Sequence, residues 1–95
     1  MKTFKDLKVG DLIFEVDHRD KIANIGRIRN ISQPQLYDGN LIIFVFNVIV
    51  GRATVAVTAV HKKNLDKYYC TEFEGDITVF SNESDFLNYL INESI

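Results

Sequence analysis

The chain has 95 residues, of which 46% are hydrophobic and 25% charged, and its formal net charge is −2. A chain of this length has room for one compact core, and its composition excludes a disordered, fibrous or low-complexity segment. We therefore expect a single domain over residues 1–95. The one cysteine, Cys70, excludes an intramolecular disulfide and a multi-cysteine zinc site, and it favours a reducing, cytoplasmic location.

The first two predicted strands pair as a hairpin. Over residues 12–17 we expect side chains to alternate between the two faces of a strand, so that Leu12, Phe14 and Val16 share one face. A polar loop of hairpin length then leads into a second strand over residues 21–31.

The period of this second strand is ambiguous. Its isoleucines recur every three residues, which also fits a helix, but Gly26 would weaken a helix by about 1 kcal/mol. We favour a strand with a β-bulge at Gly26, which would bring Ile25 and Ile28 onto one face. Arg27 and Arg29 then project together from the face opposite Ile28.

Residues 32–40 form the longest predicted loop. Pro34 disfavours a central strand there, and we expect Leu36 and Tyr37 to be partly exposed.

Two apolar strands follow, over residues 41–50 and 53–60, with a tight turn at Gly51-Arg52 between them. The whole apolar stretch is long enough to suggest a membrane span. However, Arg52 near its middle would cost about 3 kcal/mol in a bilayer, and the many β-branched residues favour strands. Residues 41–50 are apolar on both faces, so we expect this strand to be covered on both sides.

The last third of the chain contains a short hairpin and a helix. Residues 68–73 and 77–80 are the two predicted strands, and residues 82–94 change to a helical period. The apolar residues of this helix form one stripe: Phe86, Leu87, Leu90 and Ile91. We expect the stripe to pack on the outer face of the strand at residues 41–50.

Six strand-like segments followed by one helix predict a mainly β fold. We expect a small SH3-like barrel or a strongly bent antiparallel sheet of five to six strands, with one C-terminal amphipathic helix. The segment 7–31, with the pattern Leu-x-x-Gly-Asp-x-Ile from Leu7 to Ile13, resembles the first hairpin of SH3-like small barrels. The resemblance implies a fold class. Many SH3-like barrels bind peptides or nucleic acids through their loops, but the acidic and aromatic signature of eukaryotic SH3 domains is not evident here.

Charge is distributed unevenly along the chain. Residues 1–63 carry ten Lys and Arg against six Asp and Glu, a net +4, whereas residues 64–95 carry one against seven, a net −6. The basic residues could form a nucleic-acid-binding stripe if their strands are neighbours: Arg27, Arg29, Arg52, Lys62 and Lys63. The net acidic charge of the whole chain argues against this interpretation, and ordinary exposed strand residues explain the same pattern.

Patterns for catalysis and metal binding are weak. Cys70 with His18 or His61 is the available combination of nucleophile and base, but a lone cysteine in a strand is usually a small buried hydrophobe. Asp17, His18 and Asp20 lie close together without the spacing of a calcium loop. We therefore expect no catalytic residue, no metal and no cofactor.

The predicted function is a non-enzymatic binding or protein-interaction module. One helix covers only part of a sheet, and the apolar surface left over favours self-association or a protein partner, with no membrane involved. The residues expected to make contact come from the long loop and the basic set: Leu36, Tyr37, Arg27, Arg29, Arg52, Lys62 and Lys63. Two alternatives remain open, a small nucleic-acid-binding barrel and an enzyme that uses Cys70 with a histidine.

Overall fold

The computed structural model describes residues 1–37, 39, 41–52, 54–71 and 75–93. Seven strands lie in these ranges: β1 (Leu12–Asp17), β2 (Ile22–Ile31), β3 (Gln35–Tyr37), β4 (Leu41–Val50), β5 (Thr54–His61), β6 (Tyr69–Thr71) and β7 (Ile77–Phe80). They are accompanied by two 3-10 helices and one α-helix: η1 (Phe4–Asp6), η2 (Lys62–Asn64) and α1 (Glu83–Glu93). The predicted mainly β fold with one C-terminal helix is confirmed.

The predicted loop at residues 32–40 was wrong in part, because it contains the short strand β3. Pro34 precedes this strand and does not interrupt it, so the chain can pair with the start of β4, with Leu36 opposite Ile42. Residues 38, 40, 53, 72, 73 and 94, which belong to predicted elements, lie outside the described residues.

All strand pairs of the sheet are antiparallel. The strand order is β3-β4-β2-β1-β7-β6, and β5 pairs with the other edge of β4. β2 and β3 lie along the same edge of β4, where β2 pairs with its last residues and β3 with its first. β4 and β5 account for the apolar stretch that could have suggested a membrane span, and no helix in the described part of the chain is long and apolar enough to cross a bilayer.

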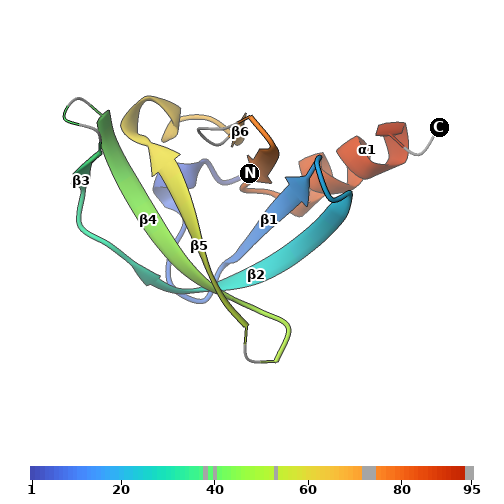
Figure 1. Ribbon diagram of the computed structural model, residues 1–95, viewed down its shortest axis with the longest axis horizontal. Coiled ribbons are helices and arrows are strands. Elements are labelled where there is room, and N and C mark those ends of the chain that lie inside the picture. The colour runs from blue at the N-terminus through green and yellow to red at the C-terminus, as the bar shows by residue number, and fades with distance from the viewer. Residues whose placement is uncertain (38, 40, 53, 72–74, 94–95) are drawn as a thin grey trace.

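The sheet curls strongly into a half-barrel (Figure 1). The Thr58 hydroxyl of β5 donates a hydrogen bond to the Glu15 carboxylate of β1, although β4 and β2 lie between these strands. In a flat sheet, strands three positions apart would be about 14 Å from each other. The hydrogen bond therefore requires that the sheet fold back on itself. β5 and β6 do not pair within the described residues, so the barrel remains open between them.

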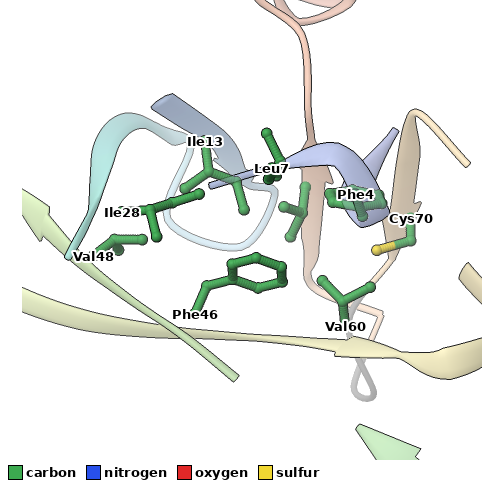
Figure 2. Packing of buried hydrophobic residues seen from close by; sticks show 9 residues of the cluster. Phe4, Leu7, Ile13, Ile28, Phe46, Val48, Val60 and Cys70 are labelled. Atoms are coloured by element: carbon green, nitrogen blue, oxygen red, sulfur yellow. The ribbon is translucent and has the colours of Figure 1, made fainter. Parts of the chain in front are cut away.

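The main hydrophobic core fills the concave side of this sheet. Figure 2 shows the Phe46 ring between Ile28 and Val48 on one side and Val60 and Cys70 on the other. Phe4, from the 3-10 helix η1, joins the cluster and is 1% exposed. The N-terminal segment thus plugs the curled sheet.

α1 packs on β1 and β7, not on β4. Phe86 is 3% exposed and lies against Phe14 and Phe80, with ring centroids 5.1 and 6.1 Å away. Figure 1 shows the helix beside β1 and away from the long β4–β5 ribbon. The predicted contact with the outer face of residues 41–50 is wrong, because Phe14, on the outer face of β1, binds the aromatic residue of the helix.

The buried stripe of α1 also differs from the prediction. Tyr89 and Leu90 pack with Phe86 on the second hydrophobic cluster. Leu87 and Ile91, which were predicted to be part of the stripe, are 44% and 58% exposed. The helix is therefore rotated about its axis relative to the prediction, so that two apolar residues, Leu87 and Ile91, are exposed.

The predicted bulge at Gly26 is also wrong. Gly26 pairs regularly with Ile13 and Val50, and the register shifts between Ile28 and Asn30 instead. Consequently Ile25 is half exposed while Ile28 is buried, on the other face. An added Cβ at Gly26 would lie 3.0 Å from the Cβ of Val48, so the curl leaves no room for a larger residue without displacement of Val48.

Candidate interaction surface on the outer face of the sheet

The outer face of the sheet is only partly covered. Because α1 packs on β1 and β7, the outward side chains of β2, β4 and β5 carry no further layer in the described part of the chain. Ile25 is 50% exposed, and Val55 and Val57 of β5 are 57% and 60% exposed. Ile49 of β4 lies between Arg27 and Val55, its partners in the register. The outward Val45, Asn47 and Ile49 of β4 are partly buried, so the expectation that β4 is covered on both sides holds only in part, with α1 not packed on its outer face.

A groove of about 460 Å³ crosses this face. Its lining combines apolar side chains with two cations: Val9, Leu12, Ile25, Arg27, Arg29, Ile49 and Gly51. We call Ile25, Arg27, Arg29, Ile49 and Val55 the outer patch.

The sequence correctly placed the two arginines of the outer patch together. Arg27 and Arg29 are exposed on the face opposite the buried Ile28. Arg52 follows Gly51 in the turn after β4 and is also exposed, so it adds a third positive charge at this end of the sheet.

Arg27 is held in place by the turn before β1. Its Nη1 donates a hydrogen bond to the Gly10 carbonyl oxygen at 2.7 Å. The Gly10 amide donates to the Ile28 carbonyl at 2.8 Å, and the Ile28 amide donates to the Asp11 carbonyl at 2.8 Å. A hydrogen bond from the Lys2 ammonium to the Asp11 carboxylate, 2.9 Å long, lowers the pKa of Asp11 and fixes the same turn. The position of Arg27 is thus set by backbone structure.

The outward face of α1 has the opposite character. Glu83, Leu87 and Ile91 are spaced four residues apart, so they follow one face of the helix, and all three are exposed. The helix contains Glu83, Asp85 and Glu93 and no lysine or arginine. The face with Leu87 and Ile91 therefore carries two apolar side chains and one carboxylate, that of Glu83.

The remaining predicted contact residues lie elsewhere. Leu36 and Tyr37 are exposed on β3, beside the first residues of β4. Lys62 and Lys63 are exposed in η2, directly after β5, whereas Arg52 lies just before β5. A strand of eight residues is about 26 Å long. The basic residues therefore form two separate groups at opposite ends of β5, not one stripe.

Sequence reasoning missed the apolar part of the outer patch and the exposed side of α1. Ile25 was assigned to the buried face, and Leu87 and Ile91 to the buried stripe. The signal available in the sequence was Tyr89, which is spaced three residues from Phe86 and replaces Leu87 in the stripe.

Cys70 and Asp17, which were considered for catalysis and metal binding, contribute to the core and to a turn. Cys70 is buried in the main core, as expected of a small hydrophobe. The Asp17 carboxylate accepts hydrogen bonds from the amides of Arg19 and Asp20, at 2.9 and 3.1 Å, which stabilise the hairpin turn. Within the described ranges, no three His, Cys, Asp or Glu residues are grouped so that they could hold a metal ion.

Comparisons with protein-family models, with curated proteins and with solved structures found no match to this chain.

Proposed function

We propose that this chain is a protein-interaction module, built on a small SH3-like barrel, that binds an acidic amphipathic helix on the outer patch. The chain itself supplies such a helix in α1, so the first partner that we propose is a second copy of the same chain. The observation that carries the proposal is the exposed apolar and cationic outer patch, which α1 of the same chain leaves uncovered.

The two surfaces are complementary in character. Leu87 and Ile91 are one helical turn apart, about 6 Å along the axis, and would fill a groove whose lining is mostly apolar. Arg27 and Arg29 line this groove, and Glu83 lies one helical turn before Leu87 on the helix. Opposite charges around an apolar contact steer association and fix its orientation.

The arrangement also suits a closed dimer. α1 and the outer patch lie on the same outer side of the sheet, because Phe14 under the helix and Leu12 in the groove share one face of β1. Two copies related by a twofold axis could therefore each place α1 on the outer patch of the other, which is an isologous contact. An 11-residue helix is only about 16 Å long, so the interface would be small and the dimer weak and concentration-dependent.

We do not extend the proposal to nucleic acid. Lys62 and Lys63 are separated from Arg52 by the length of β5, and Arg27 is engaged with the Gly10 carbonyl. A backbone-tracking surface needs a continuous row of cations, and the acidic last third of the chain would repel phosphates. We also propose no catalytic role for Cys70, because its burial in the core keeps it from solvent.

Sedimentation velocity over a range of concentrations tests the proposal through a charge swap. Arg29→Glu and Glu83→Arg should each weaken self-association, because each variant opposes like charges in both contacts of the dimer. An equimolar mixture of the two variants should associate again, since each helix then meets a groove of opposite charge. Lys63→Glu is the matched control, and it should associate as the wild type does.

Three results would contradict the proposal. The wild type could remain monomeric at every concentration, the mixture could associate no better than the separate variants, or Lys63→Glu could weaken association as strongly as Arg29→Glu.

A further inference from the structure

A second groove lies on the other side of α1, over the hairpin of β6 and β7. Its volume is about 500 Å³, large enough for several residues of a peptide. Among the described residues, its lining is rich in aromatic rings and contains one carboxylate: Met1, Tyr68, Tyr69, Thr71, Thr78, Phe80, Asp85 and Tyr89. This aromatic groove is separate from the outer patch and shares no lining residue with the groove there.

Strand pairing places four of the lining residues. Tyr69 pairs with Phe80, and Thr71 pairs with Thr78, so these two cross-strand pairs form the floor and one wall. Phe80 is buried beside Tyr69, with ring centroids 6.2 Å apart. The opposite wall comes from α1, where Asp85 and Tyr89 are four residues apart and share one face.

His18 fixes the position of the helical wall relative to the floor. Its Nε2 lies 2.7 Å from Thr78 Oγ1, and its Nδ1 lies 3.1 Å from the Tyr89 hydroxyl oxygen. The rings of His18 and Tyr89 also meet edge to face at 5.6 Å. The Tyr89 ring is in addition 5.5 Å from Phe80. The groove is therefore preorganised by contacts among the turn after β1, β7 and α1.

The electrostatic character of the groove favours a cation. The faces of tyrosine and phenylalanine rings are negative and attract ammonium and guanidinium groups. Asp85 adds a full negative charge at the rim, and residues 64–95, which supply all the lining except Met1, carry a net charge of −6. An anionic ligand would meet repulsion here, and an uncharged one would leave Asp85 without a partner.

We propose that the aromatic groove binds a lysine side chain of an extended basic peptide segment, with the ammonium group between the tyrosine rings and the Asp85 carboxylate. The alkyl stem of the lysine would lie along the exposed ring of Tyr69, next to the buried Phe80. This site is independent of the self-association proposed above, because Leu87 and Ile91 face away from the groove that Asp85 and Tyr89 line.

The test is an NMR titration of the 15N-labelled protein with a short, end-capped peptide that has a central lysine. We expect saturable shifts of the amides of Tyr69, Thr71, Asp85 and Tyr89. A peptide with norleucine in place of lysine keeps the alkyl stem and lacks the charge, and it should bind at least about fivefold more weakly.

Substitutions in the groove test whether the lysine peptide binds there. Asp85→Asn keeps the size of the side chain and removes its charge, and Tyr69→Leu removes an exposed ring; each should weaken the lysine peptide about fivefold. Tyr37→Leu is the matched control, because Tyr37 is a similarly exposed tyrosine on β3, outside the groove, and it should change nothing. The proposal is overturned if the lysine peptide shifts no groove amide, if the norleucine peptide binds equally well, or if Tyr37→Leu weakens binding as much as Tyr69→Leu.

Discussion

At the scale of the residue, His61 links stability to pH. It lies at the end of β5 opposite Ile43 and is half buried. Burial, and to a smaller degree the charge of Lys63, lower the pKa of His61 below its ordinary value of 6.5. The folded state therefore disfavours the charged imidazolium, whereas the unfolded chain takes up the proton near pH 6.5.

Consequently, the stability that depends on neutral His61 is complete above about pH 6.5 and is lost as the pH falls through the lower pKa of the folded state. We expect His61→Gln to lose less free energy of unfolding than the wild type between about pH 7 and about pH 5, as measured by urea unfolding. An equal loss in the variant would show that another group causes the pH dependence.

Two carboxylates should change the stability of the fold only at lower pH. Hydrogen bonds from the Thr3 hydroxyl and the Lys2 ammonium lower the pKa values of Asp6 and Asp11, respectively. Their contribution is present above the ordinary pKa of 3.8 and disappears below it, so it does not overlap with that of His61.

Sequence reasoning at this scale succeeded where alternation alone decides the orientation of a side chain. It placed Phe14 and Val16 on one face of β1 and Arg27 opposite Ile28, as the structure has them. It failed at Gly26, because a glycine in a strand has two explanations, a bulge or a close approach of a neighbour. Here the close approach is the explanation, because the Val48 side chain lies against Gly26. The position of Val48 depends on the pairing of two strands that are about twenty residues apart in the chain.

At the scale of the element, α1 provides a direct comparison of two neighbouring apolar residues. Phe86→Ala should lower the free energy of unfolding by about 3 to 4 kcal/mol, because it removes a ring that packs between Phe14 and Phe80. Leu87→Ala should change it by less than about 0.5 kcal/mol in the monomer, because that side chain is exposed. Urea unfolding at low protein concentration measures both, and equal losses would contradict the rotation of the helix described above.

The existence and ends of α1 could be predicted from its period, but its partner could not. The sequence of the helix fits two alternative apolar stripes equally well, one that includes Leu87 and Ile91 and one that includes Tyr89. The choice depends on which strand the helix meets, and aromatic contacts with Phe14 and Phe80 favour β1 and β7 over the more apolar β4. β3 was missed for a related reason, since three residues after a proline form a strand only because β4 offers an edge.

At the scale of the whole molecule, the placement of α1 determines which surface remains for partners. Had the helix covered β4, the outer patch would be buried and the chain would have no large apolar surface beside its arginines. Because the helix lies on β1 and β7, one part of the outer face is apolar and positive and the helix surface beside it is apolar and negative. Arg27 and Arg29 of the basic part of the sequence and Glu83 of its acidic part thus lie on one side of the fold.

The candidate surface could be only half predicted from the sequence. The arginines follow from strand alternation, but the exposed Ile25, Val55 and Val57 depend on the absence of a covering helix. Lys62 and Lys63 could not be placed relative to Arg52 without knowing that β5 continues unbroken to His61.

The most direct test is an isotope-filtered NOE measurement on a concentrated sample in which half of the molecules are 13C-labelled at their methyl groups. We predict intermolecular NOEs between Leu87 and Ile91 of one copy and Ile25, Ile49 and Val55 of the other. The account is contradicted if these contacts occur within a single chain, which would mean that α1 covers its own outer patch, or if no intermolecular NOE joins the two sets of methyl groups.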